Sequence, residues 1–156
     1  MRRFLWATLT ASLSLSGCDL RDSDLPAVYR ELAVPAERLG SPDVQRQGRA
    51  IYRQRCVLCH GEQADGKGVR APDLTPPPRN FTDVDWQART DDRHVYFAIA
   101  EGRHGTPMPQ WKATLSPGEI WSLIAYIRTV APRPASADGG EATDVAPART
   151  TGQDRH

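Results

Sequence analysis

The chain has 156 residues, enough for one globular domain but hardly for two. Hydrophobic residues make up 39% and charged residues 25% of the sequence, values typical of soluble globular proteins, and the formal net charge is +1. The sequence contains no basic stripe interleaved with aromatic residues, so we predict no nucleic-acid partner.

Residues 1–17 have the features of an export signal peptide. Two arginines follow the initiator, and the uncharged run at residues 4–16 is too short to span a bilayer. The run ends in Leu15-Ser16-Gly17-Cys18, which resembles the lipobox of bacterial lipoproteins. This resemblance implies cleavage before Cys18 and acylation of its thiol and amine, and Asp19 resembles a signal for retention in the inner membrane. We therefore expect an exported protein, lipid-anchored at the periplasmic face of that membrane. The alternative is an ordinary signal peptide with a cysteine nearby by chance.

Composition divides the rest of the chain into three parts. Residues 18–40 are charged and show no sustained periodicity, which predicts a tether. Residues 132–156 are rich in Pro, Ala, Gly, Asp and Thr, which predicts a disordered tail. A folded domain is expected over residues 41–131, near the small end of the range in which a bound cofactor often supplies part of the core.

Three helices are predicted in this domain, and no segment has a convincing strand pattern. The first begins at Ser41-Pro42-Asp43, the second at Thr90-Asp91-Asp92, and the third at the capping-box sequence of residues 116–119. Their apolar residues recur at helical spacing and are expected to form the core. Residues 61–89 lack periodicity, and so long a loop in so small a domain suggests that it wraps a buried group.

Cys56-Val57-Leu58-Cys59-His60 is the most informative motif in the chain. On one helical turn the two thiols and the imidazole project together, which suits addition of both thiols to the vinyl groups of a haem and ligation of its iron by His60. A thioredoxin-like redox pair would require a βαβ setting, and a zinc site would require a second pair of ligands; the sequence indicates neither. We therefore predict one covalent haem c, bound through Cys56 and Cys59.

The second axial ligand is predicted to be Met108, the only methionine besides the initiator. Pro107 and Pro109 flank it and restrict the loop, which helps a weak thioether ligand to stay bound. His104 is the main alternative ligand, and an open sixth position is the remaining one.

Residues 41–131 resemble a single-haem, class I bacterial cytochrome c. The matches are Gly48 and Tyr52 before Cys56, the Cys-x-x-Cys-His-Gly motif at 56–61, Ala-Pro-Asp-Leu at 71–74, Pro-Arg-Asn-Phe-Thr at 78–82, Gly-x-x-Gly-Thr-x-Met-Pro-x-Trp at 102–111, and Leu123 and Tyr126. The resemblance implies a small all-α fold, in which three main helices and long loops surround one covalent haem.

The resemblance also implies particular contacts. The first and last helices should cross at Gly48, against Leu123 and Tyr126. The carbonyl of Pro72 should accept the Nδ1 hydrogen of His60 and orient its ring. The residues that the resemblance places at the haem propionates are Arg79, Trp111 and Tyr126. The lysine-rich docking rim of soluble mitochondrial members is absent here, so their partners are not carried over.

These features predict an electron-transfer protein without catalysis of its own. With both His60 and Met108 on the iron, no position is open to a substrate, and redox proteins at the membrane surface are the expected partners. Two alternatives remain open: a haem subunit of a larger oxidoreductase complex, or a peroxide- or gas-reactive haem protein from which Met108 dissociates.

Overall fold

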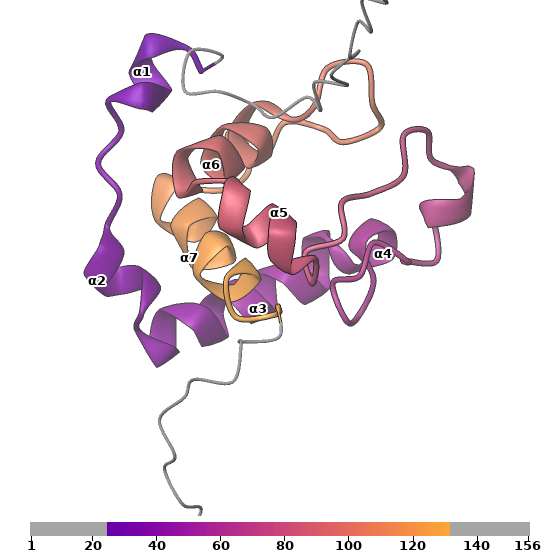
Figure 1. The fold of residues 1–156 in the computed structure, drawn as a ribbon, viewed down its shortest axis with the longest axis horizontal. Helices are drawn as coiled ribbons and strands as arrows, with labels where there is room; N and C mark the ends of the chain where they lie inside the picture. Colours follow the sequence, from indigo (N-terminus) through magenta and orange to yellow (C-terminus); the bar gives the residue numbers. More distant parts are fainter. Residues whose placement is uncertain (1–24, 132–156) are drawn as a thin grey trace, which may run out of the picture.

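The computed structural model describes residues 25–131, and all regular structure in this part of the chain is helical (Figure 1). The helices are α1 (Ala27–Arg30), α2 (Ala36–Leu39), α3 (Pro42–Arg55), α4 (Val57–His60), the 3₁₀ helix η2 (Ala71–Asp73), α5 (Val84–Arg89), α6 (Asp92–Glu101) and α7 (Pro117–Ile127). The all-α prediction is confirmed. The predicted signal peptide, Cys18 and the predicted tail lie outside the described residues.

The three predicted helices are the three longest, α3, α6 and α7, and their starts follow the sequence signals. The Asp91 carboxylate accepts a hydrogen bond from the backbone N–H of His94 at the start of α6. At the start of α7, Ser116 and Glu119 form the reciprocal capping box. Ser41 precedes Pro42 as predicted, but its side chain makes no capping hydrogen bond.

The backbones of α3 and α7 cross at Gly48. A Cβ atom on Gly48 would lie 1.8 Å from the carbonyl oxygen of Ser122 and 3.0 Å from Cβ of Tyr126. The crossing is therefore where the resemblance to class I cytochromes c placed it, and Tyr126 lies next to Gly48 as expected. The nearest neighbour on α7, however, is the backbone of Ser122 rather than Leu123, whose side chain is buried in the core.

The expected long loop over residues 61–89 contains η2 and α5. Asp83 caps α5 by accepting hydrogen bonds from the N–H groups of Asp85 and Trp86. The Trp86 ring packs on Phe81 with a centroid distance of 5.3 Å, and the Arg128 guanidinium lies 5.9 Å from the Trp86 centroid. A helix of six residues is too short to show a periodic pattern in the sequence. The contacts of Trp86 with Phe81 and Arg128, both outside the helix, stabilise it.

Residues 25–40, which were predicted to be part of a tether, are folded in the structure. This segment forms α1 and α2 and packs on the domain, with Leu25 only 3% exposed and the Tyr29 ring edge-on to Phe97 at 5.0 Å. The Nε of Arg93 on α6 donates to the carbonyl of Leu32 at 2.9 Å. The apolar residues of the segment are irregularly spaced, so the sequence gives no periodic sign of this packing. None of the helices in residues 25–131 has the length and apolar character needed to span a membrane.

Replacing Gly48 with Ala should be strongly destabilising, because the new methyl group would overlap the Ser122 carbonyl and force α3 away from α7. Overpacking of this kind costs about 1–3 kcal/mol, and we expect the upper end of that range or more. The control is Gly118→Ala, since the added Cβ would approach no atom closer than 3.9 Å. Denaturant unfolding of the purified protein measures both, and equal stability of Gly48→Ala and wild type would contradict the crossing.

Candidate functional site

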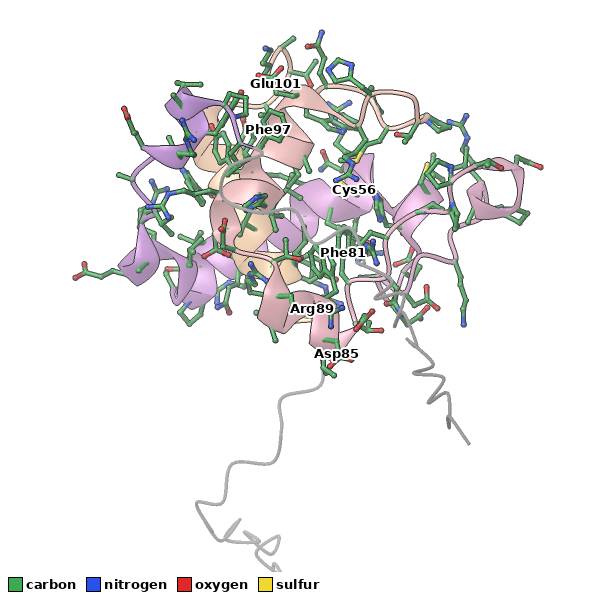
Figure 2. All side chains as sticks on the ribbon, turned by 45° about the horizontal axis from the view of Figure 1, so that its top comes forward. Cys56, Phe81, Asp85, Arg89, Phe97 and Glu101 are labelled. Carbon is green, nitrogen blue, oxygen red and sulfur yellow. The ribbon has the colours of Figure 1, made fainter. Side chains whose placement is uncertain are left out.

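A predominantly apolar cavity lies between the crossing helices and the loops that follow them. Its lining residues are Tyr52, Cys56, His60, Phe81, Ile99, Met108, Trp111, Leu123 and Ile127. Three of the four residues predicted to attach or ligate a haem thus meet at one cavity. Cys56 is half-buried and Phe81 is buried, and Figure 2 labels both near the middle of the molecule in that view. Cys59, the fourth, is not among the lining residues.

The two cysteines and His60 lie on one tight helical turn. Cys56 is the cap residue between α3 and α4. Its carbonyl accepts hydrogen bonds from the N–H groups of Cys59 (3.1 Å) and His60 (2.9 Å). Both thiols are free. Burial, reinforced by the neighbouring Cys59, raises the pKa of Cys56 to about 12, so its thiol is protonated at neutral pH.

The His60 ring is held by a backbone carbonyl and by an aromatic ring. Its Nδ1 lies 3.1 Å from the carbonyl oxygen of Arg79, which accepts the Nδ1 hydrogen. The Phe81 ring stacks on the imidazole with a centroid distance of 4.7 Å and an interplanar angle of 16°. The predicted acceptor, the carbonyl of Pro72, is therefore replaced by that of Arg79. The reason is that Phe81 N–H bonds the carbonyl of Ala64 at 2.8 Å, which draws the chain just before Phe81 against His60.

This arrangement leaves the second ring nitrogen of His60 as the ligand atom. Burial lowers the pKa of His60, opposed by the hydrogen bond to the Arg79 carbonyl, so the ring is neutral at pH 7. With its proton on Nδ1, the ring carries a lone pair on Nε2. A neutral imidazole whose other nitrogen bonds a carbonyl is the usual form of a metal-ligating histidine.

Met108 reaches the cavity from the loop after α6. The carbonyl of Met108 accepts a hydrogen bond from the N–H of Arg103 at 3.2 Å, and its own N–H lies 3.3 Å from Oγ1 of Thr106. The loop turns at Gly105, which has a φ of +74°. His104, the alternative ligand, is exposed and does not line the cavity.

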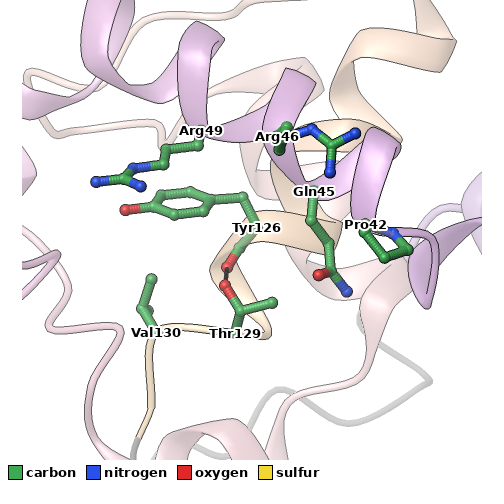
Figure 3. Close-up of a pocket in the computed structure, with 7 residues that line it drawn as sticks. All are labelled: Pro42, Gln45, Arg46, Arg49, Tyr126, Thr129 and Val130. Carbon is green, nitrogen blue, oxygen red and sulfur yellow. Dashed lines mark hydrogen bonds between the residues drawn. The ribbon is translucent and has the colours of Figure 1, made fainter. Parts of the chain in front are cut away.

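The four further residues implied by the resemblance are spread over the molecule. Trp111 lines the cavity, whereas the side chains of Arg79 and Pro72 are exposed. Tyr126 lines a separate groove of about 390 Å³ between α3 and α7, beside Arg49 (Figure 3). The contacts of Arg79, Trp111 and Tyr126 with haem propionates stay predictions.

Several residues that shape the cavity were not predicted to have a functional role. Phe81 stacks on the predicted ligand, and the Tyr52 hydroxyl donates to the carbonyl of Gly61 at 2.8 Å, directly after the motif. The core residues Ile99, Leu123 and Ile127 also line the cavity. Phe81 lies in the Pro-Arg-Asn-Phe-Thr match at 78–82, but the match did not indicate that its ring would stack on His60.

The chemistry of the side chains at the cavity suits a haem. An imidazole nitrogen and a thioether sulfur are the axial ligands of many haem irons, and the largely hydrocarbon lining suits the faces of the macrocycle. Within residues 25–131, no group of three or more His, Cys, Asp and Glu side chains could hold a metal ion without such a cofactor.

The chain is similar to known c-type cytochromes and to subunits of cytochrome oxidases. Residues 43–127 match the family model described as cytochrome c oxidase, cbb3-type, subunit III. The chain is 32% identical over 83 residues to the cbb3-type cytochrome c oxidase subunit FixP of a Bradyrhizobium species, an alignment covering 53% of this chain and 26% of that protein. It is 31% identical over 86 residues to a cytochrome c-553-like protein of a Synechocystis species, covering 54% of this chain and 67% of that protein.

One solved structure is similar over a comparable region. It is the reducing HAO-like protein complex Kustc0457/Kustc0458 of Kuenenia stuttgartiensis, with 25% identity and a TM-score of 0.52 over 60% of this chain and 49% of that chain. The matched region thus spans about a quarter of the FixP relative and about two thirds of the cytochrome c-553-like protein.

Replacing both Cys56 and Cys59 with Ser should give a colourless protein that is unfolded or degraded. The apolar cavity lining would then be left without the haem predicted to cover it, and a domain this small often depends on a cofactor for stability. Absorbance of the purified protein and its circular dichroism report the two effects. A stably folded double variant without haem would contradict this account of the cavity.

Proposed function

The chain belongs to the family of cytochrome c oxidase, cbb3-type, subunit III, and on that premise we propose that it transfers single electrons through one haem c attached to Cys56 and Cys59. The observation that carries the proposal is the meeting of Cys56, His60 and Met108 at one apolar cavity. The haem iron, when bound, supplies a one-electron couple between its ferric and ferrous states.

The residues around the cavity set the conditions for that couple. The Arg79 carbonyl orients His60 and increases the basicity of Nε2. As a ligand, the Met108 thioether would be weak and neutral, which would favour the reduced state and raise the potential. The apolar side chains of Ile99, Leu123 and Ile127 would limit the access of water to a bound haem.

Electron transfer is favoured over catalysis at the iron because both axial positions have a candidate protein ligand. A peroxide or a gas would have to displace Met108, whose loop is fastened by hydrogen bonds to Arg103 and Thr106.

We propose redox proteins as the partners, with membership in a larger complex as a variant of the same function. Several relatives are named as subunits of cbb3-type oxidases, which supports an oxidase as one partner. The cytochrome c-553-like relative supports a separate carrier, because the matched region covers most of that protein.

We further propose that acylation of Cys18 anchors the protein at the periplasmic face of the inner membrane. The support is the lipobox-like sequence at residues 15–18, followed by Asp19. More than one acyl chain gives stable attachment to a bilayer, whereas a single chain gives only marginal binding.

Replacing Met108 with Ala should keep the covalent haem, because Cys56, Cys59 and His60 remain, but it should empty the sixth position. The long-wavelength sulfur-to-iron band of the ferric protein should vanish, and carbon monoxide should bind the ferrous form at once. The reduction potential should fall by on the order of a tenth of a volt or more, within the roughly 0.8 V range set by axial ligands.

His104→Ala is the matched control in the same loop, and it should change neither the band nor the binding of carbon monoxide. If His104→Ala rather than Met108→Ala opened the iron to carbon monoxide, the axial ligands would be His60 and His104. Immediate binding of carbon monoxide by the wild type would favour a gas-reactive protein instead.

Replacing Cys18 with Ser should abolish lipidation, leaving either an uncleaved precursor or protein released from the membrane. Labelling of growing cells with radioactive palmitate, followed by membrane fractionation, measures both effects. Failure of the label to enter the wild-type protein would show that the lipobox interpretation is wrong.

A further inference from the structure

The loop that carries Met108 is built directly onto the C-terminal end of α6. Gly102 follows the last residue of α6, and a Cβ atom there would lie 2.7 Å from the carbonyl oxygen of Met108. Further along the loop, the N–H groups of Trp111 and Lys112 donate to the carbonyls of Ile99 (3.1 Å) and Ala100 (3.2 Å). Any movement of this helix end therefore moves the backbone of Met108.

Glu101, the last residue of α6, bonds two distant parts of the chain at once. One carboxylate oxygen accepts a hydrogen bond from Nζ of Lys112 at 2.6 Å, and the other accepts one from the Tyr29 hydroxyl. The hydrogen bonds from Lys112 and Tyr29 lower the pKa of Glu101, so the carboxylate is ionised at neutral pH. Burial and the bond to Glu101 raise the pKa of Tyr29 to about 12, so its hydroxyl keeps the proton it donates.

The segment that carries Tyr29 is itself packed on α6. Its ring lies against Phe97 at 5.0 Å and Tyr96 at 6.1 Å, and Phe97 lies one turn before Glu101 near α1 (Figure 2). Leu25 is buried, and the bond from Arg93 to the carbonyl of Leu32 fixes the other end of the segment. This packing therefore fixes the position of the Tyr29 hydroxyl beside Glu101.

We propose that Tyr29, Glu101 and Lys112 are positioning residues for the Met108 ligand, through which the N-terminal segment at residues 25–32 holds the Met108 loop closed. The proposal rests on the proposed ligation of iron by Met108. A thioether is a weak ligand, so the fraction of time that it is bound depends on how freely its loop opens. Because Glu101 bonds both Tyr29 and Lys112, it holds the end of α6 and the far end of the Met108 loop in place, and this restricts the opening of the loop.

The test uses the haem-loaded, full-length protein and the rate at which its ferrous form binds carbon monoxide, which requires Met108 to leave the iron. Tyr29→Phe removes only the hydroxyl and keeps the ring against Phe97, and Lys112→Met keeps the aliphatic stem. Each should raise the rate about three- to tenfold, the fold-change that corresponds to losing one typical hydrogen bond at a partly exposed site. Each should also weaken the sulfur-to-iron band of the ferric protein.

Glu101→Gln should raise the rate at least as much, and adding Tyr29→Phe to it should raise the rate little further, because both changes act through the same carboxylate. The control is Asp43→Asn, which removes a carboxylate from the exposed pair of Asp43 with Arg46 on α3 and should leave the rate unchanged.

Unchanged rate and band in Tyr29→Phe, with the band present in the wild type, would overturn this proposal alone. A lower thermal midpoint with an unchanged rate would also overturn it, because the contact would then be merely structural. A wild type that lacks the band and binds carbon monoxide at once would overturn Met108 ligation, and this proposal with it.

Discussion

The close crossing of α3 and α7 at Gly48 is the constraint on which the rest of the structure depends. Because no side chain separates Gly48 from the Ser122 carbonyl, the two helices lie backbone to backbone. Cys56 ends α3, and Leu123 and Ile127 face the same cavity from α7. The crossing therefore sets the distance between the attachment motif and the apolar wall opposite it.

The two predicted axial ligands are held in different ways. His60 lies on a hydrogen-bonded turn, between a backbone carbonyl and the ring of Phe81, and the covalent attachment at Cys56 and Cys59 would restrict it further. Met108 lies on a loop without regular secondary structure, whose position depends on the end of α6. The methionine side is thus the one at which contacts far from the iron can alter ligation.

Much of the fold and site could be predicted because the signals were local. Capping sequences marked the starts of α6 and α7, and the Cys-x-x-Cys-His motif marked a helical turn. The rest depends on tertiary contacts that leave no local pattern. Helix α5 needs its packing with Arg128, and residues 25–32 need the surface of α6. The Arg79 carbonyl reaches His60 because Phe81 bonds Ala64.

The central claim is the proposal that His60 and Met108, which line the same cavity, would both ligate the iron of one haem. X-ray absorption at the iron edge of the purified ferric protein tests it most directly, since sulfur and nitrogen ligands scatter at different distances. The account predicts one sulfur ligand from Met108 beside nitrogen ligands from the macrocycle and His60. An iron surrounded by nitrogen alone, or one lacking a sixth ligand, would contradict it.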